Sequence, residues 1–435
     1  MTTTKTPSCP FAASRRGFLL GAGAIAAAGG GAGAAIAAES EAARPQVADA
    51  PIAHSDARRR TPFYGVHQAG VVTPRPACGI VAAFDLVAAN PEELQTLFRK
   101  LTERIAFLTQ GGRAPDRDPK LPPADSGILG PVIEPDELTV TVSVGDSLFE
   151  DRAWLKPLKP KTLMRMAGFP NDALVARSCH GDVLLQFCAN SQPTNIHALR
   201  DIIKNTSDSM VLRWRQEGSV PVVPPQPDGK SESARNFLGF RDGSANPDSN
   251  DDALMEKIVW VGAGDPDEPK WAHGGSYQVV RLIRMLVEDW DRTPLGEQER
   301  IFGREKWSGA PLGVLGGSEH DIPDYAADPK GDLTPLTAHM RLANPRRPET
   351  EANLIVRRGF NFSNGVTKSG HLEDGLLFLS YQADLAQGFL AVQSRLNGEP
   401  LEEYIKPFGG GYFFVLPGVR DESDYLGRSL IEAIA

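Results

Sequence analysis

The sequence predicts an α+β fold made of two ferredoxin-like halves, each an antiparallel sheet with two helices on one face and the element order β-α-β-β-α-β. Three observations lead to this prediction. Short apolar runs of strand length alternate with longer stretches of helical periodicity. The same order of elements occurs before and after a proline-rich segment, residues 220–230. At 435 residues, the chain is also too long for one small core.

The first half, residues 63–218, contains four predicted strands. Apolar and β-branched residues dominate each of them. The second strand alternates leucine or valine with threonine and serine, which is typical of a strand with one buried face. The four predicted strands cover residues 79–87, 138–144, 183–188 and 210–215.

Two helices are predicted between these strands. Asn90 is a capping residue and Pro91 suits a first helical turn, so a helix begins there and continues to about Leu108. Its apolar face repeats at helical spacing and consists of Leu94, Leu97, Phe98, Leu101 and Ile105. A second helix begins near Pro193, and its apolar stripe consists of Ile196, Leu199, Ile202 and Ile203.

The second half, residues 236–435, repeats this order after an extended linker, residues 219–235. A long insertion rich in glycine, aspartate and proline separates Trp307 from Leu333. The predicted strands of this half cover residues 276–286, 354–361, 376–381 and 412–416, and the predicted helices cover residues 295–304 and 384–396.

Residues 1–38 are predicted to be a signal peptide that is not part of the fold. Ser14 to Leu19 reads SRRGFL, a twin-arginine signature. The glycine- and alanine-rich run that follows is only weakly apolar, which favours a cleaved signal over a transmembrane helix. Small residues at positions 35–38 suit two adjacent cleavage sites. We therefore expect twin-arginine export to the periplasm or the extracellular space, a flexible lead-in over residues 39–62, and no membrane insertion after processing. The alternative, a cytosolic protein with an alanine-rich tail, leaves the arginine pair unexplained.

Composition excludes some classes of partner. The net charge is -9 and no basic stripe carries interleaved aromatic residues, so nucleic acid is not expected as a partner. The cysteines outside the signal are Cys78, Cys179 and Cys188. No C-x-x-C pair occurs, so neither a zinc ribbon nor a redox-active dithiol is predicted.

Residues 236–247, with the sequence NFLGFRDGSANP, are expected to form a loop because glycines and an Asn-Pro pair interrupt them. The loop carries Asp242, which is either a reactive carboxylate or simply part of an Asp-Gly turn. Two further residues are candidates. His339 opens the segment HMRLANPR, and Arg357 lies in NLIVRRGFNFS. Taken alone, the histidine is better explained as structural and the arginine as a surface ion-pair residue like Arg358.

Together these stretches resemble the dye-decolorising (DyP-type) peroxidases, which are haem enzymes. The family pattern is a GxxDG motif, here residues 239–243, then a histidine and then an arginine. More closely, the chain is similar to the exported deferrochelatase/peroxidase (EfeB-type) branch of that family. The segments FYGVHQAG, ANSQPTNIHALRDIIKNTSD and LRWRQEGSVP fit that branch as well. The resemblance covers nearly all of the chain after the signal, and it implies the family's duplicated fold with haem in the second half.

The resemblance also assigns roles to residues. It implies that His339 is the proximal ligand of the haem iron, that Asp242 is a distal acid/base catalyst and that Arg357 is the distal cation. Strand alternation places Arg357 and Arg358 on opposite faces, and the family pattern selects Arg357 for the pocket. Further haem contacts map to Gly243, Ser244, Ala245, Asn344, Pro345 and Arg346.

Several roles around the haem stay open. Arg346 is expected to pair with a haem propionate, with Arg341 and Arg347 as rivals. Asp384 is a candidate hydrogen-bond partner for the proximal histidine. Three large aromatic residues could pass electrons to bulky dyes: Trp214, Trp271 and Tyr381. Core packing explains each of them better. No C-x-x-C-H motif occurs, so the haem b is expected to be held non-covalently.

The resemblance predicts an exported haem b peroxidase that reduces hydrogen peroxide and oxidises dyes or other organic reductants. The alternative is a haem-binding protein for iron acquisition, a deferrochelatase that releases iron from haem and has only secondary peroxidase activity. That branch is associated with ferrous-iron uptake systems, so components of such a system are candidate partners. The sequence leaves the reducing substrate and the formation of homo-oligomers open.

Overall fold

The computed structural model describes residues 59–115, 117–221, 223 and 232–434. The predicted signal peptide, most of the predicted lead-in and much of the linker lie outside the described residues. Every helix and strand of the described residues belongs to one compact unit, Ala53–Ala435. Among the described residues, no helix has the length and apolar character needed to cross a membrane.

The first half has the predicted order of strands and helices. It consists of β1 (Cys78–Leu86), α1 (Pro91–Gln110), β2 (Thr139–Gly145), β3 (Val183–Ala189), α3 (Gln192–Thr206) and β4 (Met210–Ser219), with a short helix α2 (Asp146–Glu150) after β2. Helix α1 starts where predicted because the Asn90 side chain accepts a hydrogen bond from the backbone N–H of Glu93 at 2.9 Å. The five predicted apolar side chains of α1 are all fully buried, and each stabilises the fold by about 1.5–3 kcal/mol.

The second half repeats the order with shorter helices and with one interrupted strand. Its main elements are β5 (Ser276–Met285), α6 (Leu295–Phe302), β6 (Val356–Arg357), β7 (Phe360–Val366), β8 (Leu372–Gln382), α8 (Ala391–Leu396) and β9 (Ile405–Val415). Four further short helices are α4 (Asp252–Ile258), α5 (Val287–Trp290), α7 (His339–Ala343) and α9 (Arg428–Ile434).

Two element predictions for this half need correction. The single strand predicted over residues 354–361 is divided into two strands, β6 and β7, although the N–H of Arg358 between them still donates to the backbone oxygen of Leu379 on β8 at 2.9 Å. Arg358 turns inward there, and its guanidinium donates hydrogen bonds to the backbone oxygens of Thr73 and Pro74. The helix predicted over residues 384–396 begins as a π-helical turn, Ala386–Leu390, before it continues as α8.

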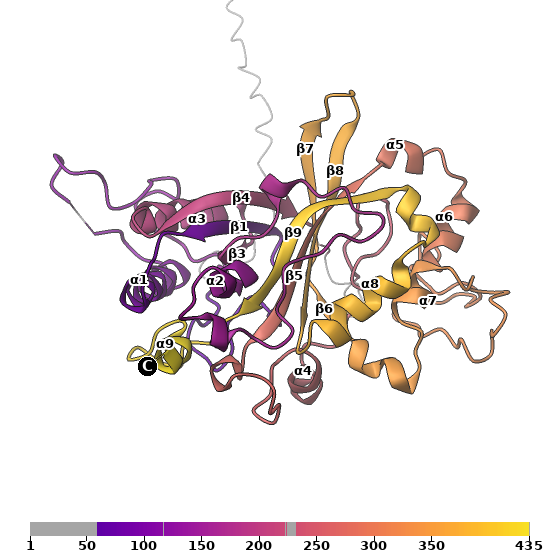
Figure 1. Ribbon diagram of the computed structural model, residues 1–435. Coiled ribbons are helices and arrows are strands. Elements are labelled where there is room, and N and C mark those ends of the chain that lie inside the picture. Colours follow the sequence, from indigo (N-terminus) through magenta and orange to yellow (C-terminus); the bar gives the residue numbers. More distant parts are fainter. Residues whose placement is uncertain (1–58, 116, 222, 224–231, 435) are drawn as a thin grey trace, which may run out of the picture. The chain divides into compact units, whose positions relative to one another are not determined.

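The strands of both halves form one closed sheet. The hydrogen-bonded order is β5-β9-β2-β3-β1-β4-β7-β8, and β8 pairs with β5 again, while β6 pairs with β8. Each half contributes four neighbouring strands in ferredoxin-like order, so the predicted α+β fold class is confirmed (Figure 1). The boundaries between the two predicted domains stay a prediction, because the sheet runs across both halves.

The interior of the closed sheet is partly polar. All seven residues of β2 are buried, so the prediction that this strand exposes one face was wrong. Two of its polar side chains, Thr141 and Ser143, have hydrogen-bond partners there, whereas the Thr139 hydroxyl is buried without one among the described residues. The Ser143 hydroxyl donates to Oε1 of Gln278 at 2.6 Å, and the Thr141 hydroxyl donates to the backbone oxygen of Ala69 at 2.7 Å. Closure of the sheet supplies these partners, and a single strand gives no sign of it.

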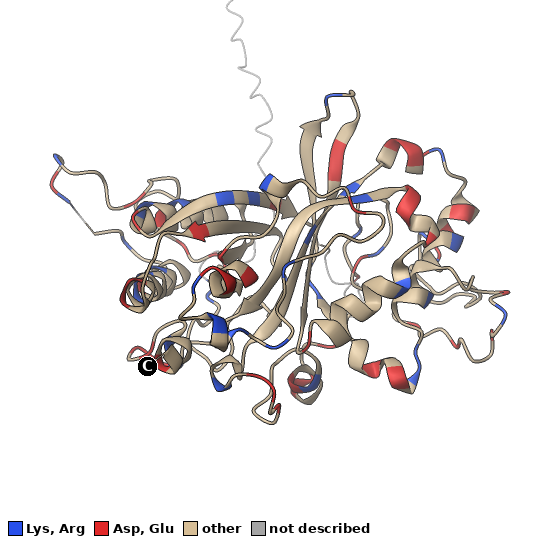
Figure 2. Ribbon diagram, in the orientation of Figure 1, with Lys and Arg blue, Asp and Glu red and all other residues tan. Residues whose placement is uncertain are grey.

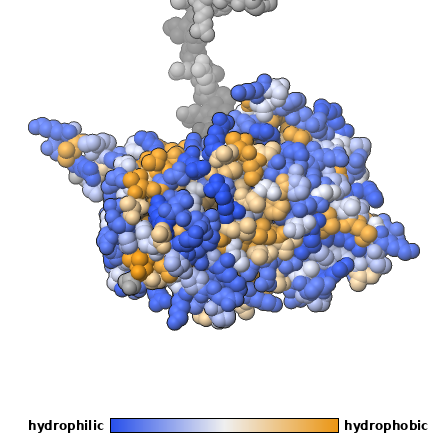
Figure 3. All heavy atoms as spheres, in the orientation of Figure 1, coloured by the Kyte–Doolittle hydropathy of each residue, from blue (hydrophilic) through white to orange (hydrophobic). Residues whose placement is uncertain are grey.

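The helices lie outside the closed sheet. In Figure 1, α1 and α3 cover the first half, whereas α6, α7 and α8 lie beside β5 and β8. Lysine and arginine are interspersed with aspartate and glutamate in Figure 2, in agreement with the lack of a basic stripe in the sequence. On the face drawn in Figure 3, apolar side chains are scattered among polar ones.

Candidate active site

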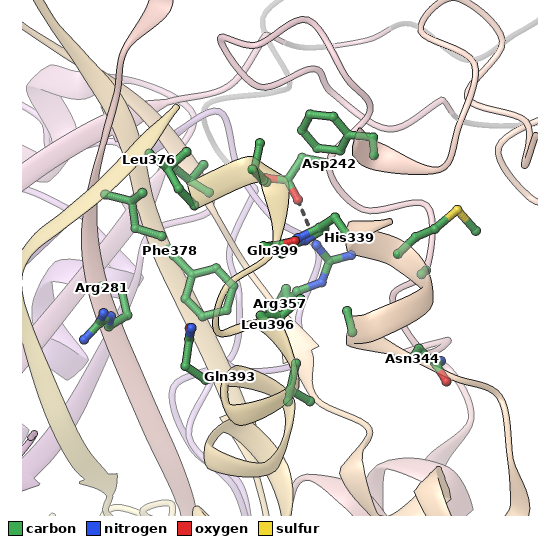
Figure 4. A pocket seen from close by; sticks show the side chains of 18 of the residues that line it. Asp242, Arg281, His339, Asn344, Arg357, Leu376, Phe378, Gln393, Leu396 and Glu399 are labelled. Carbon is green, nitrogen blue, oxygen red and sulfur yellow. Dashed lines mark hydrogen bonds and ion pairs between the residues drawn. The ribbon is translucent and has the colours of Figure 1, made fainter. Parts of the chain in front are cut away.

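A cavity lies between the outer wall of the sheet and the helices of the second half. Strand β8 forms part of its wall, because Leu376 and Phe378 point into the cavity while Leu377 and Leu379 pack inside the closed sheet. Helices α7 and α8 and the loop before Ala245 enclose the other sides (Figure 4). The first half also contributes, through Phe169, Asn171 and Asp172.

His339 is the first residue of α7, and its ring lines the cavity. Nδ1 lies 2.8 Å from a carboxylate oxygen of Glu399, whose side chain is only 4% exposed. No described residue hydrogen-bonds to Nε2, the other ring nitrogen. Burial lowers the pKa of His339, but the charge and the hydrogen bond of Glu399 raise it more, so the net shift of the pKa is upward.

Glu399 therefore takes the position for which the sequence analysis named Asp384. That candidate is wrong, because the Asp384 carboxylate accepts a hydrogen bond from the backbone N–H of Gln387 at 2.8 Å and caps the π-helical turn. Glu399 follows α8, and the fold returns it to α7 across 60 residues of sequence. Nothing in the local sequence around Glu399 indicates this contact.

Asp242 and Arg357 form a second pair that lines the same cavity. Oδ1 of Asp242 lies 3.1 Å from Nη1 of Arg357 (Figure 4). The Asn246 side chain ties their backbones together, because it donates to the oxygen of Arg357 at 2.7 Å and accepts from its N–H at 3.0 Å. Both charged groups act on His339: Arg357 lowers its pKa and Asp242 raises it.

The Asp242 loop is a tight hairpin. The N–H of Asp242 donates to the oxygen of Ala234 at 2.8 Å, and Arg235 pairs with Arg241 in an antiparallel bridge. Gly243 has a φ of 144°, which is in the region that favours glycine, and a Cβ there would lie 2.9 Å from Oγ of Ser233. The second glycine of the GxxDG motif, Gly243, is therefore required by the turn that carries Asp242.

The structure separates the two neighbouring arginines as strand alternation predicted. Arg357 lines the cavity, while Arg358 is 3% exposed and points the other way. The comparison of Arg358 with a surface ion-pair residue was wrong, because its guanidinium is buried against the Thr73 and Pro74 carbonyls.

Most of the residues predicted to contact haem line the cavity. They are Ser244, Ala245, Asn344 and Arg346. Gly243 and Pro345 are not among the lining residues in the part of the chain that the structure describes. The rivals of Arg346 lie elsewhere: Arg341 pairs with Asp328 at 2.9 Å, and the side chain of Arg347 is 70% exposed. The haem-binding roles of these residues stay predictions.

Sequence reasoning missed Arg304, which follows α6 and lines the cavity. It is 8% exposed, and Nη1 donates to the backbone oxygens of Gly309 and Glu319. Burial lowers its pKa, as do the charges of Arg346 and Arg357, while Tyr325 and Glu319 raise it. Arg304 resembles any other arginine of a helix end in sequence, so no local signal marked it.

The aromatic residues considered for electron transfer are core residues. Trp214, Trp271 and Tyr381 are 7%, 3% and 0% exposed. Each has a hydrogen-bond partner within the protein: the two indoles donate to the backbone oxygens of His180 and Leu158, and the Tyr381 hydroxyl contacts the buried Gln186. None of the three therefore reaches the surface, where a bulky dye would bind.

An imidazole oriented by a carboxylate, with an aspartate–arginine pair in the same apolar cavity, is the donor set of a haem peroxidase site. Family models agree with this class. The model described as "Dyp-type peroxidase, N-terminal" matches residues 68–219, and the model described as "Dyp-type peroxidase, C-terminal" matches residues 233–420. The chain belongs to the Dyp-type peroxidase family and is a haem-dependent peroxidase.

Individual relatives are similar over most of their length. A deferrochelatase of Escherichia coli (strain UTI89) is 56% identical over 419 residues, which cover 96% of this chain and 97% of the relative. The crystal structure of a DyP-type peroxidase from Cellulomonas bogoriensis has a TM-score of 0.75 at 33% identity, covering 86% of this chain and 99% of that one. One from Streptomyces coelicolor has a TM-score of 0.77 at 33% identity, covering 86% and 98%.

Proposed function

We propose that this chain is an exported haem b peroxidase in which His339 holds the iron, Asp242 moves a proton and Arg357 stabilises negative charge during the reduction of hydrogen peroxide. The observation that supports it most is the convergence of two pairs on one cavity, His339 with Glu399 and Asp242 with Arg357. An organic reductant restores the enzyme after each turnover.

The charges of the cavity fit a dicarboxylate such as haem. Of the lining arginines, Arg241, Arg281 and Arg357 each have a carboxylate within 4.0 Å. Arg304 and Arg346 have no ion-pair partner among the described residues, and the lining carboxylate without one is Glu402. A buried cation such as Arg304 is costly without a counter-ion, and Arg346 is exposed at the edge of the cavity without an ion-pair partner, so these two guanidinium groups suit the two propionates. The apolar wall formed by Leu376 and Phe378 suits the macrocycle.

Each polar residue of the cavity would have a separate task once haem is bound. Haem supplies an iron centre that exchanges electrons with peroxide and with the reductant. The Asp242 carboxylate is placed to take a proton from one peroxide oxygen and to return it to the other, which leaves as water. The Arg357 guanidinium is always charged and has several fixed donors, so it stabilises the negative charge that develops on the departing oxygen. Glu399 orients the imidazole through Nδ1 and leaves Nε2 free for the iron.

A second candidate function is the release of iron from intact haem. The name deferrochelatase of the relatives at 55–59% identity favours it. Among the described residues, no group of three or more metal-ligating side chains is present that would receive the iron. We therefore give peroxidase turnover precedence and treat deferrochelation, with a link to ferrous-iron uptake, as the alternative.

The purified mature protein, loaded with haem, tests both functions in one experiment. Hydrogen peroxide with an organic dye should give many turnovers per haem, followed as loss of dye colour while the Soret band persists. Iron appearing in a ferrous chelator together with metal-free porphyrin fluorescence, without dye turnover, would instead establish deferrochelation. A protein that binds haem and does neither would contradict both proposals.

The pairing of Arg304 and Arg346 with the propionates predicts that free carboxylates are needed for binding. Haem should bind the apoprotein much more tightly than haem dimethyl ester, measured by Soret titration. The variants Arg304→Gln and Arg346→Gln should each weaken the binding of haem and leave the binding of the ester nearly unchanged. Equal losses for haem and ester would mean that these arginines act on the fold and not on the carboxylates.

Export through the twin-arginine pathway is part of the proposal. The support is the SRRGFL segment, Ser14 to Leu19, followed by a weakly apolar run. The exported form is expected to begin near Ala38 or Glu39, which intact-mass spectrometry would measure. An exported form that keeps Met1 would refute cleavage.

A further inference from the structure

The insertion between α6 and α7 contains the buried carboxylates Glu319 and Asp328, and Glu319, which is 3% exposed, is the one that contacts the Asp242 loop. Its two oxygens bind both arms of the hairpin that carries Asp242. Oε2 accepts a hydrogen bond from the Ser244 hydroxyl at 2.8 Å, and Oε1 accepts one from the backbone N–H of Ser233 at 2.7 Å. Nε of Arg241 lies 3.9 Å from Oε1, within ion-pair distance.

These contacts surround Asp242 closely in sequence. Arg241 immediately precedes Asp242, and Ser244 follows it by two residues. Between Asp242 and Ser244 stands Gly243, whose backbone alone does little to restrict the direction of the turn. The side-chain carboxylate of Glu319 therefore supplies the restraint that the loop lacks.

The surrounding packing keeps Glu319 in place. Its own backbone oxygen accepts a hydrogen bond from Arg304 at 3.2 Å. A Cβ on Gly309 would lie 2.8 Å from the Glu319 Cβ and 3.0 Å from the Arg241 Cγ, so the residues meet without a gap. Burial raises the pKa of the Glu319 carboxyl, but the hydrogen bonds of Ser233 and Ser244 and the charge of Arg241 lower it more, and the net shift of the pKa is downward. The group is therefore an anion at neutral pH.

We infer that Glu319 is a positioning residue for the reaction with peroxide: it clamps the hairpin from both sides and so fixes the Asp242 carboxylate relative to Arg357. The inference rests on the proposed role of Asp242. The inference also gives the long insertion a role in the active site, because Glu319 is the insertion residue that hydrogen-bonds to both arms of the hairpin. Since proton transfer depends strongly on geometry, a displacement of about 1 Å can cost about a hundredfold in rate.

The test compares Glu319→Gln with Glu232→Gln, both loaded with haem. Glu232 is the matched control because it pairs with the same guanidinium, Arg241, at 2.5 Å but from the solvent side. We expect Glu319→Gln to slow the reaction with peroxide by about 10- to 100-fold, measured by stopped flow per bound haem. The resting Soret spectrum and the KM for the organic reductant should not change. Glu232→Gln should react within about twofold of the wild type, since the Glu232 side chain is 37% exposed and solvent screens its charge.

Two further variants separate the outcomes. Asp242→Asn measures the role on which the inference rests: if it reacts as fast as the wild type, the proposed proton-transfer role of Asp242 fails and the inference about Glu319 fails with it. If Asp242→Asn is slow while Glu319→Gln and Ser244→Ala both react at the wild-type rate, the positioning role of Glu319 is refuted and that of Asp242 stands. Should Glu319→Gln fail to fold or to hold haem, Ser244→Ala decides, because it removes only one hydrogen bond of the clamp.

Discussion

His339→Ala should yield a folded protein that no longer retains haem, so that its Soret band is lost on gel filtration. His339 lines the cavity, and its Nδ1 is held by Glu399, so Nε2 is the ring nitrogen left to bind the iron. Without it, haem keeps only apolar contacts and the two cationic side chains. Absorption spectra of wild type and variant, recorded after the same haem loading, measure the effect. Imidazole added to the variant should restore part of the Soret band.

Glu399→Gln provides the control for this result. Glutamine has the same size and can still accept a hydrogen bond from Nδ1, so the histidine stays in place without the adjacent charge. Haem binding should persist with an affinity lowered about 10- to 100-fold, the usual effect of changing a hydrogen-bond partner of a metal ligand. If His339→Ala kept haem with an unchanged spectrum, the iron ligand would have to be another residue.

Arg357→Leu is expected to slow the reaction with hydrogen peroxide by about 100- to 1000-fold per bound haem, with little loss of stability. The Arg357 side chain is 28% exposed, and Asp242 is its ion-pair partner among the described residues. Removing the guanidinium therefore leaves only this partly buried carboxylate without its partner. Stopped-flow mixing with peroxide measures the rate, and thermal unfolding of the same sample measures stability.

The neighbouring residue provides a matched comparison in the same chain. Arg358→Leu should have the opposite effect, because Arg358 is buried and satisfies two carbonyl groups. Leaving those carbonyls unpaired costs about 1–3 kcal/mol each, so the unfolding temperature should fall while the molecules that hold haem still react with peroxide. The reverse ranking of the two variants would refute the assignment of Arg357 to the peroxide side of the haem.

Sequence patterns predicted the elements whose physics is local. Helix α1 starts at its capping residue, and the turn of the GxxDG segment follows from Gly243. The patterns were incomplete where the result depends on distant partners. β2 looks half-buried because its serine and threonine residues find their partners only inside the closed sheet. The inward direction of the Arg358 side chain, between β6 and β7, depends on the carbonyl groups of residues 73 and 74 in the other half.

The same distinction holds for the candidate site. Asp242, His339 and Arg357 lie in recognisable sequence motifs, and the structure brings all three to one cavity. Glu399 and Glu319 do not lie in such motifs. One reaches His339 from beyond α8, and the other reaches the Asp242 loop from an irregular insertion. Contacts of this kind depend on how the chain folds back on itself, and a single sequence carries no local record of them.

The two seams that join the halves are unequal. β2 and β9 share three residue pairs, Ser143 to Gly145 with Val415 to Phe413, whereas β4 and β7 share one, Ser219 with Asn361. A half expressed as a separate polypeptide would have an unpaired strand at each end of its sheet, and such edges attract other chains. The segment that carries Arg357 lies directly before the narrower seam. Transient opening of the closed sheet is therefore expected first at the β4–β7 seam, beside the cavity that Arg357 lines. The second half is not expected to function when it is expressed alone.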